Sequence, residues 1–96
     1  MAAIFLETIT GSNGVIIPPK GYLPGVRKIC DEFGILMVCD EVMAGFGRTG
    51  KLFAFENFDV VPDLVTFAKG VTCGYVPLGG VAVSKKIAEF FNDNLL

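Results

Sequence analysis

Two polar residues, Asp40 and Lys69, stand directly after short apolar segments of this 96-residue chain. Asp40 follows the run 35–39 and Lys69 follows the run 64–68, and each run has the length and composition of a buried strand. The stretch 41–62 between them is long enough for a crossover between parallel strands, which would bring both residues to the same edge of a sheet. At such an edge a lysine amine can form an imine with a carbonyl compound, and a carboxylate can keep a pyridine nitrogen protonated.

Either residue alone has an ordinary structural explanation. Aspartates at strand ends usually accept hydrogen bonds from loop amides, and lysines beside apolar strands usually extend into water. Together they fit the requirements of pyridoxal phosphate, a cofactor that needs both an amine and a carboxylate. Val42, two residues after Asp40, could then supply an apolar surface beneath the cofactor ring.

A glycine-rich stretch between the two residues allows other interpretations. Gly45, Gly47 and Gly50 match the dinucleotide-binding pattern G-x-G-x-x-G, but two acidic residues precede them where phosphates would have to approach. The same stretch nearly matches a nucleoside-triphosphate loop, yet Lys51 is followed by Leu52 instead of the Ser or Thr that binds magnesium. A turn without any ligand is the third interpretation.

The elements that must position these residues follow from hydrophobic patterning. Apolar runs predict strands, and an apolar residue at every third or fourth position over 22–33, with Pro24 in the first turn and Gly34 at the end, predicts an amphipathic helix. Ser84 is expected to cap a final helix. A strand, a helix and a second strand within about forty residues form a βαβ unit and therefore a parallel sheet. The expected strands are 2–6, 35–39, 64–68 and 78–83, with a loop over 8–20.

The composition is unusually apolar for so short a chain. Hydrophobic residues make up 52%, charged residues only 19%, and the mean hydropathy is +0.60. These values leave a membrane protein, an obligate oligomer or a piece of a larger protein. No apolar run approaches the length of a spanning helix, no signal peptide is expected, and a net charge of −2 favours neither nucleic acid nor a membrane as partner.

The absence of histidine excludes further classes of site. Without imidazole the chain can form neither a Ser-His-Asp nor a Cys-His nucleophile, and no metal site is expected. Cys30, Cys39 and Cys73 are odd in number and lie far apart in the sequence. We interpret them as buried thiols in a reducing cytoplasm.

Four segments in the right order resemble the class-III (ω-amino) aminotransferases, which belong to fold type I of the pyridoxal-phosphate enzymes. They are 11–22 (GSNGVIIPPKGY), 35–50 (ILMVCDEVMAGFGRTG), 63–70 (DLVTFAKG) and 75–80 (YVPLGG). The resemblance covers essentially the whole chain and is nearest to the branch that acts on ω-amines and on taurine or β-alanine with pyruvate.

The resemblance implies an α/β fold that is part of a three-layer α/β/α, mostly parallel sheet, with an antiparallel fourth strand. It implies that Lys69 is the Schiff-base lysine and the proton carrier of the reaction, that Asp40 is the partner of the pyridine nitrogen, and that Val42 packs on the ring. Glu7 matches an acid that in relatives lies on the substrate side and can pair with a mobile arginine. The glycine-rich loop becomes structural, shaping the site and a subunit contact.

Two positions depart from the family pattern. Residues 8–10 read Thr-Ile-Thr where many relatives have Pro-x-Gln, so the loop that enters the site is altered. Met43 stands where some relatives place a glutamine that bonds the ring hydroxyl of the cofactor, and the methionine side chain cannot make that bond.

Residues 1–96 are expected to be a central fragment of the large cofactor-binding domain, without an internal boundary. The expected reaction is ping-pong transfer of an amino group from an ω-amine or amino acid to a keto acid, in a homodimer or higher homo-oligomer. Because half of the cofactor site would lie elsewhere, the isolated fragment is expected to be inactive. A non-catalytic remnant, or another reaction of the same cofactor such as that of an aminomutase or a decarboxylase, remains the alternative.

Overall fold

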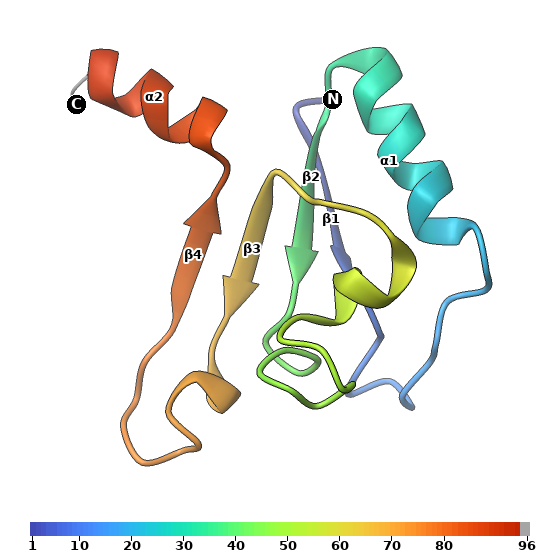
Figure 1. Cartoon of the computed structure of the whole chain (residues 1–96), viewed down its shortest axis with the longest axis vertical. Coiled ribbons are helices and arrows are strands. Elements are labelled where there is room, and N and C mark those ends of the chain that lie inside the picture. Colours follow the sequence, from blue (N-terminus) through green and yellow to red (C-terminus); the bar gives the residue numbers. More distant parts are fainter. Residues whose placement is uncertain (95–96) are drawn as a thin grey trace.

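The computed structural model describes residues 1–94 as a four-stranded sheet with helices (Figure 1). The chain order is β1 (Ala3–Glu7), α1 (Tyr22–Phe33), β2 (Leu36–Asp40), the 3-10 turn η1 (Ala54–Phe58), β3 (Leu64–Phe67), the 3-10 turn η2 (Lys69–Val71), β4 (Gly80–Val83) and α2 (Lys85–Asp93). Every predicted strand and both predicted helices are present, and the ends of the strands differ from prediction by at most two residues.

The strands are ordered β1-β2-β3-β4, with the first three parallel and β4 antiparallel to β3. The α/β class and the mostly parallel sheet are therefore confirmed, together with the antiparallel fourth strand. The carboxyl ends of β1, β2 and β3 meet at one edge, at the bottom of Figure 1, where the glycine-rich loop and η2 also lie. This is the edge at which open α/β sheets bind ligands.

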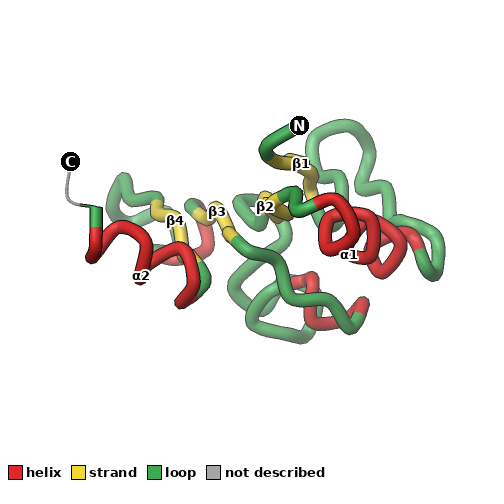
Figure 2. Tube along the Cα trace, turned by 90° about the horizontal axis from the view of Figure 1, so that it is seen from above, coloured by secondary structure: helices red, strands yellow, loops and turns green. Residues whose placement is uncertain are grey.

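Helix α1 covers one face of the sheet. Its buried residues Leu23 and Cys30 form a core with Met37 and Cys39 of β2. Gly34 ends the helix in the left-handed conformation with φ of 63°, as its position in the sequence predicts. Viewed along the sheet, α1 and η1 lie on the same side of the strands (Figure 2).

The opposite face of the sheet is open. Alternation along the strands places Phe5, Leu36, Val81 and Val83 on this face, and the side chain of Phe5 is 65% exposed. The unusual hydropathy thus has a physical cause, because strands of parallel sheets are built to be covered on both faces. Within residues 1–94 the second helical layer of the expected three-layer arrangement is not present, and no helix there is long and apolar enough to cross a membrane.

Two details differ from the sequence-based expectations. Cys30 and Cys39 are buried free thiols, as predicted, but Cys73 is exposed because it lies in the turn after β3 and not in an element. Burial raises the pKa of the Cys39 thiol to about 11. Ser84 does precede α2, but its side chain makes no capping hydrogen bond to the helix.

Asp63 links the covering helix to the sheet. One of its carboxylate oxygens accepts a hydrogen bond from the Met37 amide at 2.8 Å and pairs with the Arg27 guanidinium of α1 at 2.9 Å. Partial burial alone would raise the pKa of Asp63, but these two donors outweigh it and hold the pKa below the ordinary value of 3.8. Asp63 therefore stabilises the fold in its charged form.

We predict that Asp63→Asn lowers the free energy of unfolding by about 2 kcal/mol at neutral pH, since hydrogen bonds to a charged group are lost. Because the folded-state pKa is the lower one, this stabilisation exists above the unfolded-state pKa and disappears as the pH falls through the folded-state value. The measurement is denaturation of the whole protein at two pH values. The free energy of unfolding of Asp63→Asn should differ from that of the wild type by a large amount at pH 7 and by a small amount near pH 3. Asp31→Asn removes the exposed partner of Arg27 and should cost less than about 0.5 kcal/mol at either pH.

Candidate active site

The predicted site residues lie at the carboxyl edge of the sheet. Strand register pairs Glu7 with Asp40, and Asp40 with Thr66, so the three form one row across β1, β2 and β3. Register partners on neighbouring strands point to the same face, which here is the open face. Lys69 follows Thr66 by three residues, at the start of η2. The structure thus places Glu7, Asp40 and Lys69 at one edge of the sheet, as the sequence predicted for Asp40 and Lys69.

Asp40 has one occupied and one available carboxylate oxygen. Its Oδ1 accepts a hydrogen bond from the Val42 amide at 2.9 Å, which fixes the side chain at the strand end. Within residues 1–94, Oδ2 has no hydrogen-bond or ion-pair partner. A hydrogen bond from a loop amide, the ordinary role of a strand-end aspartate, therefore accounts for Oδ1 only. Within the described residues Oδ2 remains able to accept a hydrogen bond.

Lys69 is an exposed lysine on a strained backbone. Its φ is 42°, in the left-handed region that residues with a side chain seldom adopt, and its Nζ has no partner in the described chain. The next residue, Gly70, packs against Phe46 so closely that a Cβ at position 70 would lie 2.8 Å from the Phe46 Cβ. A tight contact beneath the turn thus fixes the backbone from which Lys69 extends.

The glycine-rich loop supplies that contact. Phe46 lies between Phe53 and Phe67, with ring centroids 5.5 and 5.7 Å away and edge-to-face geometry. Gly47 and Gly50 have φ of 86° and 87°, which glycine adopts at little cost, and the next helical segment is the five-residue turn η1. Because no helix opens at the glycines, the structure lacks the phosphate-binding geometry of a dinucleotide or nucleoside-triphosphate loop. Of the three interpretations of the glycine-rich stretch, a turn without a ligand is the one that fits this geometry.

The sequence-based reasoning missed the role of Glu41. Its side chain is fully buried and accepts hydrogen bonds from the Thr8 hydroxyl at 2.7 Å and from the Ala54 and Phe55 amides at 2.9 Å. This carboxylate ties the end of β1, the end of β2 and the start of η1 together. The available signal was the pair Asp40–Glu41 after an apolar strand. Because side chains alternate between the two faces of a sheet, one of the two carboxylates must point to the face that α1 covers.

Glu7 is used in part by its own loop. Its Oε2 accepts a hydrogen bond from the Gly11 amide at 2.7 Å, and Thr10 pairs with Ile16 to close a short antiparallel loop. The residue also lines a cavity of about 420 Å³ that Thr8, Asn13 and Tyr22 help to enclose.

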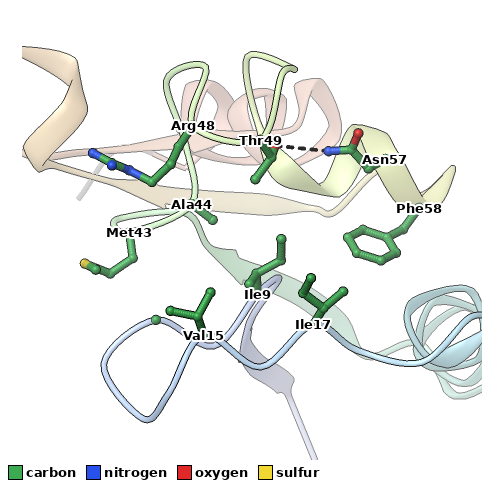
Figure 3. Close-up of a pocket in the computed structure, with 10 residues that line it drawn as sticks. Ile9, Val15, Ile17, Met43, Ala44, Arg48, Thr49, Asn57 and Phe58 are labelled. Atoms are coloured by element: carbon green, nitrogen blue, oxygen red, sulfur yellow. Dashed lines mark hydrogen bonds between the residues drawn. The ribbon is translucent and has the colours of Figure 1, made fainter.

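A larger cavity, of about 450 Å³, lies beside this edge (Figure 3). Figure 3 shows Val15 and Ile17 of the N-terminal loop facing Asn57 and Phe58 across it, with Thr49 hydrogen-bonded to Asn57 at 3.0 Å. Neither Asp40 nor Lys69 lines it, and its lining has no nucleophile paired with a base. The candidate site at the strand ends is therefore separate from this cavity. The lining residues are Ile9, Gly11, Val15, Ile17, Met43, Ala44, Arg48, Thr49, Asn57 and Phe58.

The free atoms at the strand ends fit the cofactor that the family resemblance implies. Within the described residues, Lys69 offers an amine without a partner, Asp40 a carboxylate oxygen without a partner, and Val42 a partly buried apolar side chain. The hydroxyl oxygen of Thr66, the register partner of Asp40, is buried and has no hydrogen-bond partner among residues 1–94. A polar atom left without a partner at this point is what a site that receives a polar ligand leaves behind.

The comparison with protein families agrees with this geometry. The family model "Aminotransferase class-III" matches residues 1–94. The chain therefore belongs to the class-III aminotransferase family.

Individual relatives are similar over nearly all of the chain. An omega-aminotransferase of Caulobacter vibrioides is 53% identical over 93 residues, which are 97% of this chain and 21% of the relative. The crystal structure of a taurine:2-oxoglutarate aminotransferase from Bifidobacterium kashiwanohense, in complex with PLP and glutamate, is 70% identical with a TM-score of 0.95 and covers 97% of this chain and 21% of that one. A thermostable (S)-enantioselective omega-transaminase from Thermomicrobium roseum is 50% identical with a TM-score of 0.94, over 98% of this chain and 21% of that one. The chain thus spans about one fifth of the length of these relatives.

We predict that Gly70→Ala displaces the Lys69 turn, because the new Cβ meets the Phe46 Cβ, which is close to the backbone and cannot rotate away. Overpacking of this kind costs about 1–3 kcal/mol of unfolding free energy. Gly25→Ala is the matched control, because Gly25 lies inside α1 with nothing within 4 Å of an added Cβ. That change should leave stability unchanged or raise it by about 0.5–1 kcal/mol. The measurement is the free energy of unfolding of both variants by denaturation of the whole protein. Equal values for Gly70→Ala and Gly25→Ala would contradict the importance of the Gly70–Phe46 contact.

Proposed function

We propose that this chain supplies the lysine and the carboxylate of a pyridoxal-phosphate-dependent aminotransferase. The observation that carries the proposal is the placement of Lys69 and Asp40 at the carboxyl ends of adjacent parallel strands, each with a functional atom that has no partner within residues 1–94. Lys69 Nζ would hold the carbonyl carbon of the cofactor, Asp40 Oδ2 would hold the proton of its ring nitrogen, and Val42 would cover the ring face. When bound, pyridoxal phosphate supplies a carbonyl group that links to amines and a protonated ring that withdraws electrons from the substrate carbon.

In this proposal each residue would act through one particular atom. The Val42 amide holds Oδ1 of Asp40, so Oδ2 would be the oxygen that accepts the proton of the ring nitrogen. As a free amine, Lys69 Nζ would accept a proton from the substrate carbon that carries the amino group and would later donate it again, so that it would act first as a general base and then as a general acid. Glu7, in the same row as Asp40, would serve the substrate side, where it can pair with a cationic group.

The proposed reaction moves an amino group from an ω-amine or amino acid, such as taurine or β-alanine, to a keto acid such as pyruvate. The similarity to a relative named taurine:2-oxoglutarate aminotransferase supports a donor of this kind and offers 2-oxoglutarate as a second acceptor. The proposal includes a homodimer or higher homo-oligomer whose other segments complete the site, so that residues 1–96 alone would give no turnover. It also includes a reducing compartment such as the cytoplasm, supported by the free thiols Cys30 and Cys39 in the core.

The test is covalent labelling of the whole protein. We expect that borohydride reduction in the presence of pyridoxal phosphate, followed by peptide mapping, places the adduct on Lys69, and that Lys69→Ala abolishes both the adduct and turnover, with a loss of at least roughly a hundredfold in rate. Lys51→Ala, which removes an exposed lysine of the glycine-rich loop, is the control and should retain both.

Asp40→Asn tests the second residue, because asparagine can still accept the Val42 amide but lacks the charge that retains a ring proton. This variant should be labelled at Lys69 and yet turn over slowly. An active protein with an unmodified Lys69 would contradict the proposal. Turnover assays with taurine, β-alanine, pyruvate and 2-oxoglutarate would then decide the donor and the acceptor.

A further inference from the structure

Two buried polar side-chain atoms lack a hydrogen-bond partner within residues 1–94, Arg27 Nε and Thr66 Oγ1. The Arg27 guanidinium is otherwise well paired, with Asp31 at 2.8 Å and Asp63 at 2.9 Å. The same Asp63 oxygen accepts the Met37 amide near the start of β2, at the opposite end of the strand from Asp40. Thr66 has only one side-chain polar atom, so its hydrogen-bonding capacity is wholly unused. An unsatisfied buried hydroxyl costs free energy and calls for a specific explanation.

The position of Thr66 supplies the explanation. It is the only polar residue of β3, between apolar neighbours in the sequence Leu-Val-Thr-Phe, and it pairs in register with Asp40. Its carbonyl oxygen accepts the Glu41 amide at 2.9 Å, which fixes the backbone here and leaves the side chain as the variable part. The side chain of Thr66 therefore lies in the row that carries Asp40, three residues before Lys69, on the face of the sheet opposite α1. The residue as a whole is only partly buried, although the hydroxyl oxygen itself is covered.

We propose that Thr66 is a cofactor-contacting residue whose hydroxyl hydrogen-bonds a polar group of the ligand held by Lys69 and Asp40. This inference rests on the function proposed above and adds a third side chain to the site. The hydroxyl is both a donor and an acceptor, so it can serve an anionic or a neutral ligand oxygen. Its lack of a partner within residues 1–94 is then a property of the site, because the ligand supplies the partner.

Thr8 offers a matched comparison within the same chain. Its hydroxyl is also buried, but it donates a hydrogen bond to Glu41 at 2.7 Å. Replacing threonine by valine keeps the shape and removes the hydroxyl. For Thr8→Val we expect a loss of stability of the cofactor-free protein, since Glu41 loses a donor, whereas Thr66→Val should leave that stability unchanged or raise it, since an unsatisfied group disappears.

The experiment measures the affinity of the whole, cofactor-free protein for pyridoxal phosphate by absorbance titration, together with its denaturation midpoint. We expect Thr66→Val to weaken binding about fivefold to tenfold, as the loss of one hydrogen bond implies, and Thr66→Ser to restore the affinity. If Thr66→Val leaves the affinity unchanged, or if Thr66→Ser fails to restore it, the inference is overturned. In the first case, a lowered midpoint would show that another segment of the protein satisfies the hydroxyl.

Labelling separates this inference from the function on which it rests. At saturating pyridoxal phosphate the borohydride adduct should still form at Lys69 in Thr66→Val. An unchanged affinity with normal labelling would refute the role of Thr66 alone. Failure of the wild-type protein to form the adduct would refute the proposed function and, with it, the role of Thr66.

Discussion

The buried carboxylate of Glu41 is the interaction on which the edge of the sheet depends. It accepts three hydrogen bonds, from a hydroxyl at the end of β1 and from two amides at the start of η1. A fully buried charge is expensive unless its oxygens are satisfied, and here every bond comes from a different residue. Because the bonds can form only when these segments meet, Glu41 specifies how the segment 42–58 returns to the sheet.

This anchor reaches Lys69 through apolar contacts. Glu41 fixes the two ends of the glycine-rich segment, which carries Phe46 into contact with Phe53, Phe67 and Gly70. Gly45 is required at the entrance, since an added Cβ would lie 2.8 Å from the Glu41 carbonyl oxygen. The strained turn at Lys69 therefore rests on a packed aromatic cluster whose own position depends on a buried carboxylate. Strain of this kind persists only where the surroundings determine it.

Much of the fold could be predicted because local patterns and global structure agree. The apolar runs, the helical spacing over 22–33 and Gly34 at the helix end all describe the observed elements. Asp40 and Lys69 could be placed at one edge because parallel strands leave no other choice. What could not be predicted depends on how distant segments meet, such as the Phe46–Gly70 contact and the lack of a partner for the Thr66 hydroxyl among residues 1–94. Cys73 was misjudged for the same reason, because residue type suggests burial while the turn after β3 exposes it.

The pair Asp40–Glu41 shows how two carboxylates at one strand end acquire different surroundings. The two carboxylates are adjacent in sequence, and alternation directs them to opposite sides of the sheet. Glu41 meets η1 on the side that α1 covers, where donors satisfy both of its oxygens, and it becomes part of the core. Asp40 meets the open side, where a single amide satisfies one oxygen and the other remains unpaired in this part of the chain. A carboxylate with complete hydrogen bonding stabilises the fold, and one with incomplete hydrogen bonding is available to a ligand. The open face, which makes the chain so apolar, is therefore also the face on which one oxygen of Asp40 and the hydroxyl of Thr66 have no partner within residues 1–94.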